Sequence, residues 1–325
     1  MKKKAYARAG VDVDLGNKLK RRIQSLVRQT HGPQVLGKIG GFGGLFRGKF
    51  PGVRDPVLVA SIDGVGTKLK IAFALNKHDT VGADLVNHCV DDIAVLGARP
   101  LFFLDYIGCE KLEPRVFDQL LRGFSRACRE AKCALIGGET AQMPGMYRRG
   151  EYDLAGCIIG VVDRSKMIDG RKIKPGDVVL GMRSNGLHTN GYSLARKVLP
   201  RSRKIYKELL CVHKNYQPLL AKAPNGMIKG LAHITGGGLI DNLPRVLPHN
   251  CDAVIETKSW RVPRIFQVLQ QNGKVGRKEM FQVFNMGIGM VAIVSPRDAK
   301  RAMSILRAKR IGRIERGSGK TRLTF

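Results

Sequence analysis

The sequence predicts a two-domain protein that mixes helices and strands. Its 325 residues, of which 43% are hydrophobic, are enough for two modest cores rather than one. In the first half, apolar runs of strand length alternate with stretches of helical periodicity. A polar, turn-rich segment at 163–175 separates two later strands. We therefore expect a boundary near Lys166, with domains at 1–166 and 167–325.

The first 50 residues predict a helix followed by a glycine-rich segment. Apolar residues recur at helical spacing across 14–30, namely Leu15, Leu19, Ile23, Leu26 and Val27. The segment GKIGGFGGLFRGKF at 37–50 is either a mobile lid over a phosphate or a flexible linker. Its cations, Lys38, Arg47 and Lys49, favour the lid. On that interpretation the nucleotide contacts include Gly41, Gly43 and Gly44.

An apolar run at 57–62 has the length and β-branching of a buried strand, and it delivers Asp63 into the turn DGVGTK. Glycines in this turn allow backbone N–H groups to approach a phosphate, and Lys68 adds a point charge. The Walker A pattern is absent, and a strand ending in a tight turn is the simpler interpretation of this stretch alone. The predicted phosphate contacts are Gly64, Gly66, Thr67 and Lys68.

Residues 81–98 predict a helix with an apolar stripe formed by Leu85, Cys89, Ile93 and Leu96. A second face holds Asp84, His88 and Asp91. At about 100° per residue, Asp92 falls within roughly 20° of Leu85, where an unpaired carboxylate would cost several kcal/mol. An arginine or a cap would satisfy it structurally. We favour a metal, because Asp63 offers a second acid.

Two further strands are predicted to end near acids. LFFLDYIG carries Asp105, and CALIGGETAQMPGMY carries Glu139. Glycines before Glu139 leave room for a ligand, and the predicted nucleotide contacts here are Gly137, Gly138 and Thr140. Hard oxygen donors without a Cys/His cluster suit Mg²⁺ bound to a nucleoside triphosphate. The predicted magnesium ligands are Asp63, Asp92 and Glu139.

The second half offers polar loops ahead of short helices. SNGLHTN at 184–190 precedes a helix expected from Tyr192, and such a helix start suits an anion. Taken alone, His188 in this loop is more simply a surface histidine. HITGGG at 233–238 repeats the arrangement, and FNMGIGMVAIV at 284–294 predicts a closing core strand.

The bulk composition limits the class of protein. The net charge of +31 suggests an acidic partner such as RNA, but residues 55–110 hold eight acids against four bases. Aromatic content is only 6% and no nucleic-acid-binding signature occurs, so we expect no nucleic-acid partner. Seven cysteines without a CxxC pair fit reduced thiols. Without a signal-peptide or membrane-spanning stretch, we expect a cytoplasmic protein.

Six motifs, in this order, resemble phosphoribosylformylglycinamidine cyclo-ligase, also called aminoimidazole ribonucleotide synthetase. They are DGVGTK at 63–68, GARPLFFLDY at 97–106, GGETAQMPGMY at 137–147, HTNGYSL at 188–194, HITGGG at 233–238 and FNMGIGM at 284–290. The resemblance runs from about Tyr6 to at least Ile293. No single motif would suffice, but together they are specific.

The resemblance implies an α/β plus α+β architecture, in which the N-terminal domain pairs with its twin in a homodimer and the C-terminal domain closes over the site. It implies that ATP and Mg²⁺ are used to convert formylglycinamidine ribonucleotide to aminoimidazole ribonucleotide, ADP and phosphate. It also implies catalytic roles for Asp63, Lys68 as electrostatic stabiliser and His188 as proton handler. The implied substrate contacts are His188, Asn190, Gly191, Thr235, Gly236, Gly237 and Gly238.

This chain also departs from the family pattern. Asp91-Asp92 stands where the family usually has Asn-Asp, and a proline-threonine pair is missing around 209–216. Among proteins of the same architecture, selenophosphate synthetase would need a cysteine before Cys89, and the hydrogenase-maturation dehydratase ends in a reactive cysteine, whereas this chain ends in LTF. A thiamine-phosphate kinase-like enzyme and a basic nucleic-acid-binding protein on a decayed enzyme fold remain as alternatives.

Overall fold

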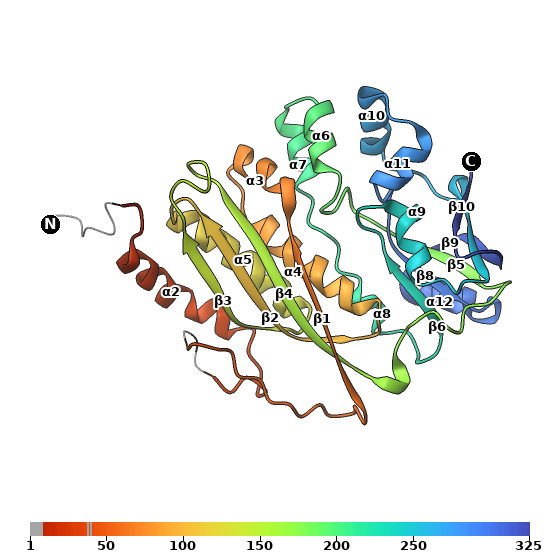
Figure 1. The fold of residues 1–325 in the computed structure, drawn as a ribbon, viewed down its shortest axis with the longest axis horizontal. Helices are drawn as coiled ribbons and strands as arrows, with labels where there is room; N and C mark the ends of the chain where they lie inside the picture. The colour runs from red at the N-terminus through yellow and green to blue at the C-terminus, as the bar shows by residue number, and fades with distance from the viewer. Residues whose placement is uncertain (1–8, 38, 40) are drawn as a thin grey trace.

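The computed structural model describes residues 9–37, 39 and 41–325. It contains a four-stranded and a six-stranded sheet, which lie in the two halves of the chain and side by side in Figure 1. Lys166 lies in the short turn Arg164–Lys166 that leads from the last strand of the first sheet toward the second. Lys38 of the glycine-rich segment lies outside the described residues.

The first sheet has the order β1-β4-β2-β3. Its strands are β1 (Pro56–Gly64), β2 (Arg99–Cys109), β3 (Ala134–Gln142) and β4 (Tyr152–Asp163). β4 pairs antiparallel with both β1 and β2, whereas β2 and β3 are parallel. β4, the last of these strands in the sequence, therefore lies between β1 and β2, and β1 and β3 form the two edges of the sheet.

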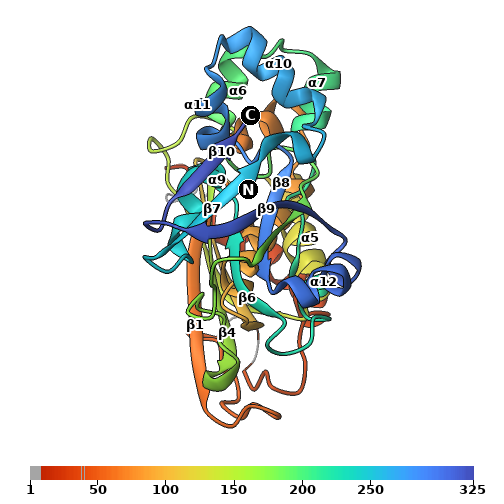
Figure 2. The same cartoon turned by 90° about the vertical axis from the view of Figure 1, so that its right-hand side faces the viewer.

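One face of this sheet is covered by helices, which Figure 2 shows beside β1 and β4. The covering elements are α4 (Asp79–Ala94) and α5 (Pro114–Glu130), and α2 (Val13–Arg28) packs in turn on α5. Nearly all of α4 is buried, as expected for a helix between a sheet and a second helix. The helical periodicity at 14–30 and 81–98 and the strand at 57–62 are confirmed. The expected burial of that strand is wrong, because β1 is an edge strand whose residues are all exposed or half-buried.

The opposite face of the first sheet is open. Alternate residues of β1 point away from α4, and Leu58 and Ile62 are 63% and 72% exposed. The glycine-rich segment crosses part of this face, where the rings of Phe46 and Phe102 lie 5.2 Å apart. Large apolar side chains in contact with water on a sheet face are unusual in a monomer and indicate a surface that another layer covers.

The second sheet has the order β10-β7-β9-β5-β8-β6. Its strands are β5 (Val178–Arg183), β6 (Ile228–His233), β7 (Cys251–Glu256), β8 (Ile288–Val294), β9 (Ala308–Arg316) and β10 (Thr321–Thr324). The helices of this half are α6 (Tyr192–Val198), α7 (Arg203–Leu209), α8 (Gln217–Leu220), α9 (Gly238–Asn242), α10 (Arg264–Gly273), α11 (Arg277–Val283) and α12 (Ala299–Leu306). The core strand predicted at 284–294 is confirmed as β8, which is buried throughout.

The two halves meet along α4. Residues 211–216, between α7 and α8, lie against this helix, and the backbone N–H groups of His213 and Tyr216 donate to Asp84 and Asp91 at 2.6 and 2.8 Å. Asn87 returns a hydrogen bond to the carbonyl of His213 at 2.7 Å. We call this contact the α4 seam. Among the described residues, no helix has both the length and the apolar character needed to cross a bilayer.

Candidate active site

A cleft of about 570 Å³ lies where β1 and α4 face the loops of the second half. Its lining residues are Asp63, His88, Asp92, Asn190, Thr235, Gly236, Gly237, Asp241, Asn242 and Arg245. The lining is mostly polar and comes from both halves of the chain. Such a cleft between two domains is a common position for a small-molecule site.

Two carboxylates on this cleft come from different elements, as predicted. Asp63 lies at the end of β1 on the side that faces α4, and Asp92 lies near the end of α4. Their side chains are 40% and 25% exposed. Each is oriented by a hydrogen bond, because Gly64 N donates to Asp63 at 2.6 Å and Ser61 Oγ donates to Asp92 at 3.1 Å. The pair is therefore held toward the cleft.

Two imidazoles lie directly against these carboxylates. His88 Nε2 is 2.9 Å from Asp63 Oδ2 and 3.9 Å from Asp92 Oδ2. His233 Nδ1, at the end of β6, is 2.8 Å from Asp92 Oδ1. Neither histidine was predicted as a site residue. The available signal was the i,i+4 spacing of His88 and Asp92 on one helix, whereas nothing local connects His233 with α4.

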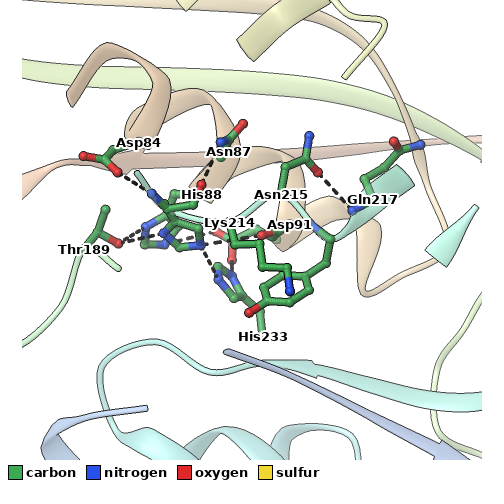
Figure 3. A network of polar contacts seen from close by, with 12 residues as sticks. Asp84, Asn87, His88, Asp91, Thr189, Lys214, Asn215, Gln217 and His233 are labelled. Atoms are coloured by element: carbon green, nitrogen blue, oxygen red, sulfur yellow. Dashed lines mark hydrogen bonds and ion pairs between the residues drawn. The ribbon is translucent and has the colours of Figure 1, made fainter. Parts of the chain in front are cut away.

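The two imidazoles are linked behind the carboxylates through the seam, as Figure 3 shows for the labelled His88, Thr189 and His233. Thr189 Oγ1 is 2.6 Å from His88 Nδ1 and 3.3 Å from His213 Nδ1. His213 Nε2 is in turn 3.0 Å from His233 Nε2. These contacts form one chain from Asp63 to Asp92, which we call the histidine chain.

The histidine chain runs between two hydrogen-bond acceptors, so proton counting constrains it. Each of the five contacts in the chain needs one proton to be a hydrogen bond, and the Thr189 hydroxyl supplies one of these protons. The three imidazole rings must supply the other four, which is one more than three neutral rings carry. Burial lowers the pKa of His88, but its hydrogen bond to Asp63 and the charges of Asp92 and Asp63 outweigh burial and raise that pKa. Burial lowers the pKa of His213 and of His233. Of the three rings, His88 is therefore the one whose surroundings favour the protonated form.

Lys68 does not lie on the cleft. Its side chain is fully buried, and Nζ donates to Asp84, to the carbonyl of His188 and to the carbonyl of Cys211 at 2.8, 3.0 and 2.7 Å. All three N–H donors of the ammonium are thus used inside the protein. The predicted phosphate contact and stabilising role of Lys68 are contradicted: its charge compensates a buried carboxylate in the α4 seam.

His188 is also internal. It has a left-handed backbone (φ 62°), is 1% exposed and stacks on His213 at a ring distance of 4.1 Å. Neither ring nitrogen has a hydrogen-bond partner among the described residues. Burial lowers the pKa of His188 well below its ordinary value. Its predicted proton transfer and substrate contact are contradicted, and so is the simpler expectation of a surface histidine.

Glu139 does not join Asp63 and Asp92 within one chain. Three inter-strand spacings separate β1 from β3, which amounts to about 14 Å. Across the sheet, Asp63 aligns through Gly156 with Asp105, whereas Glu139 pairs with Tyr106, the next residue of β2. Successive residues of a strand point to opposite faces, so Glu139 points to the open face and Asp63 to the face of α4. The predicted three-carboxylate site in a single chain is therefore wrong. The sequence gives the end of each strand but not the order of strands in the sheet.

The remaining predicted residues divide between the cleft and a second group on β3 and the glycine-rich segment. Asn190, Thr235, Gly236 and Gly237 line the cleft. Gly191 and Gly238 support it, because a Cβ on either would lie 2.2 Å or less from residues 281–284. Gly64, Gly66 and Thr67 follow Asp63, and Thr67 Oγ1 is 3.1 Å from Ser193 Oγ.

The other predicted glycines lie away from the cleft. Gly137, Gly138 and Thr140 are on β3 with Glu139, and a Cβ on Gly138 would lie 2.4 Å from the carboxylate of Asp105. Gly41 and Gly43 are exposed, and Gly44 packs on Ile136 at the β3 edge. The structure thus places these residues apart from Asp63 in one chain. Arg245, whose guanidinium donates to Asn242 at 3.2 Å, is a cleft residue that sequence reasoning missed.

Comparison with known proteins agrees with this architecture. Residues 52–162 match the AIR synthase related protein N-terminal domain, and residues 174–323 match the C-terminal domain of the same family. Phosphoribosylformylglycinamidine cyclo-ligases of Bacillus thuringiensis (strain 97-27) and Bacillus anthracis are each 49% identical over 336 residues, which covers 98% of this chain and 97% of each relative.

Solved structures of lower identity share the fold. Thiamine-monophosphate kinase from Stenotrophomonas maltophilia K279a is 17% identical with a TM-score of 0.68, covering 93% of this chain and 95% of the kinase. Hydrogenase maturation protein HypE in complex with ATP is 18% identical with a TM-score of 0.69, covering 93% and 90%. Together with the near full-length identity above, the matches to both domains show that this chain belongs to the phosphoribosylformylglycinamidine cyclo-ligase family.

Proposed function

We propose that the cleft between the two halves carries out the ATP-dependent cyclisation of formylglycinamidine ribonucleotide to aminoimidazole ribonucleotide, with release of ADP and phosphate. The observation that carries this proposal is the convergence of Asp63 and Asp92 on a polar cleft in a chain of this family. The domain division at Lys166 belongs to the proposal, because it assigns the carboxylates to 1–166 and the facing loops to 167–325.

The chemistry requires positioning and charge neutralisation rather than a protein nucleophile. The γ-phosphoryl group is transferred to the formamide oxygen, which converts that oxygen into a leaving group; the amidine nitrogen then attacks the same carbon and closes the ring. Asn190 and Thr235 provide polar contacts for the substrate, and Gly236 and Gly237 present backbone N–H groups without side-chain obstruction. Arg245 supplies the cleft with a cation for phosphate.

The residues fit a divalent cation at Asp63 and Asp92. Two carboxylates from different elements reach one cleft, each with part of its surface exposed. A divalent ion held there would neutralise the phosphates of ATP. We propose such an ion, for which the sequence predicts Mg²⁺, and assign Glu139 no role at this site from within the same chain.

We further propose a homodimer formed through the open face of the first sheet. The exposed Leu58 and Ile62, and Tyr106 at 36% exposure, would be buried by a second copy. Glu139, Gly41, Gly43, Gly44 and the β3 glycines would then belong to an active site only across the dimer interface. A cytoplasmic location fits an enzyme with seven free cysteines.

The activity is tested by measuring ADP release with formylglycinamidine ribonucleotide as substrate and detecting the aminoimidazole product. We expect ADP release to require the substrate and to match product formation one to one. ATP turnover without an aminoimidazole product, or with thiamine monophosphate as acceptor instead, would contradict the proposal. Sedimentation of wild type and of Ile62→Asp tests the dimer: the charge should convert dimer to monomer.

A further inference from the structure

We infer that a second cavity between the two halves of the chain, separate from the cleft, binds a small molecule that carries a phosphate or diphosphate group. Its volume is about 710 Å³, within the about 300 to 1,000 Å³ typical of small-molecule sites. Among the described residues, it shares no lining residue with the cleft. We call it the basic cavity. The inference does not depend on the proposed function.

The basic cavity lies at the joint between the two sheets. Its walls include residues at 97–99 and 161–172 on one side, and the loop between α8 and β6, at 220–229, on the other. Pro56, at the start of β1, pairs with Asp163 of this cavity, whereas Asp63 of the cleft lies seven residues further along the same strand. At about 3.3 Å per residue, the two sites are about 23 Å apart along β1. The basic cavity is therefore not an extension of the cleft.

The two carboxylates that line the basic cavity are already bound within the protein. Asp163 Oδ1 accepts from the backbone N–H and the hydroxyl of Ser165 at 3.0 and 2.6 Å, and its Oδ2 accepts from Arg54 N at 2.7 Å. Asp169 Oδ2 accepts from Nε and Nη2 of Arg171 at 2.7 and 2.6 Å. Neither carboxylate therefore neutralises the other cations around the cavity.

Cations outnumber these carboxylates by six to two among the described lining residues. Arg171 is engaged by Asp169, Arg164 pairs with Asp55 at 2.9 Å, and Lys229 pairs with Asp177 at 2.6 Å. The other three cations form no ion pair within the part of the chain that the structure describes, and they are Arg99, Lys166 and Lys172.

Three unpaired cations around one cavity favour an anion with more than one negative charge. A guanidinium offers paired N–H donors to a phosphate, and ammonium groups add point charges. Because low-dielectric walls concentrate the field of like charges, the cavity attracts such an anion more strongly than separate surface cations do. The remaining wall is partly apolar, formed by Leu220, Ala223 and Ile228, and it can pack against an organic group next to the phosphate.

Calorimetric titration of inorganic pyrophosphate into the full chain, with a chelator present, tests the basic cavity. The triple variant Arg99→Gln, Lys166→Gln, Lys172→Gln should bind pyrophosphate at least about tenfold more weakly than the wild type. A parallel titration with cytidine diphosphate distinguishes a nucleotide from the inorganic anion, because only the nucleotide can also contact the apolar wall.

Two control variants assign the binding to this cavity. Lys258→Gln, Arg264→Gln, Lys278→Gln removes the same charge at exposed positions outside both sites. Its affinity for pyrophosphate should change less than about twofold at about 0.15 M ionic strength, because salt screens distant charges. Arg245→Gln, in the cleft, should have an equally small effect. Thermal melts check that each variant is folded.

Hydrogen exchange of the wild type gives a second measurement that needs no variant. Pyrophosphate should slow exchange at 164–172 and 220–229, but not at 233–245 beside the cleft. Equal weakening in the charge-matched control would show general attraction to a basic protein and overturn the inference. Loss of binding in Arg245→Gln alone, protection at 233–245 alone, or no binding of pyrophosphate would also overturn it. None of these results would bear on the proposed function.

Discussion

Helix α4 carries aspartates of two kinds, and the comparison between them explains how this protein separates stability from chemistry. Asp84 and Asp91 are fully buried and accept hydrogen bonds from Lys68 and from the backbone of 213–216. Asp92, the residue next to Asp91, is partly exposed on the cleft. One face of the helix therefore joins the two halves of the chain, while the neighbouring face lines the cleft.

The cleft aspartate should show the largest effect on activity. Asp92→Asn keeps the shape of the side chain and its contact with Ser61, but removes the charge that we propose holds a divalent ion. We expect kcat to fall by about a thousandfold or more, equal to about 4 kcal/mol of transition-state stabilisation. The melting temperature should stay near that of the wild type. Steady-state kinetics with thermal melts provide the measurement, and normal turnover would contradict the role of Asp92.

Changes in the α4 seam should reduce the stability of the protein rather than its activity. Lys68→Met leaves Asp84 buried without its cation, and breaking such a pair costs about 3 to 5 kcal/mol. Denaturant unfolding should show this loss, and the double variant Lys68→Met with Asp84→Leu should recover much of it. If Lys68 instead bound a phosphate, the single variant would raise KM for ATP at unchanged stability.

A half-buried carboxylate, Asp105, sharpens the comparison, because no lysine or arginine within the described part of the chain forms an ion pair with it. Burial and the charge of Glu139 raise the pKa of Asp105 to about 7. The native state therefore binds this proton more tightly than the unfolded state, and stability falls as pH rises from about 4 to about 7. Asp105→Asn removes this loss. Its stability advantage over the wild type should grow by up to about 3 kcal/mol between pH 5 and pH 8, and a constant difference would contradict the assignment.

The smallest effect is expected at an exposed ion pair. Arg171 contacts Asp169 in the connection between the two sheets, and the arginine side chain is largely exposed. Exposed pairs of this kind contribute about 0.2 to 1 kcal/mol. Arg171→Ala should therefore change the free energy of unfolding by less than about 1 kcal/mol and leave kcat unchanged. A larger loss in denaturant unfolding would show that the linker has a structural role of its own.

Part of this arrangement could be predicted from the sequence. The strand at 57–62, helix α4 and the pairing of Asp63 with Asp92 were predicted because apolar periodicity fixes which side of an element is buried. The position of Glu139 was predicted wrongly because β4 and β2 lie between β1 and β3. The order of strands in a sheet depends on contacts between distant parts of the chain, which local patterns do not predict. Lys68 and His188 were misplaced for a related reason: residues 211–216 cover them, and nothing near either residue indicates this.

The pairing of His88 and His233 illustrates the same limit. His88 lies on the predicted helix one turn before Asp92, so its position was available from the sequence. His233 belongs to β6 in the other half of the chain and reaches Asp92 only when the seam forms. Sequence patterns thus predicted the cleft carboxylates of the first half, but the histidine contacts to them depend on the packing between the halves.

We propose above all that Asp63 and Asp92 together bind a divalent ion that accompanies ATP. Calorimetric titration of a non-hydrolysable ATP analogue in the presence of Mn²⁺ or Mg²⁺ tests it most directly, using wild type, Asp63→Asn, Asp92→Asn and Arg171→Ala. We predict that both aspartate variants lose metal-dependent binding of the analogue and that the Arg171 variant keeps it. Unchanged binding in both aspartate variants would contradict the account.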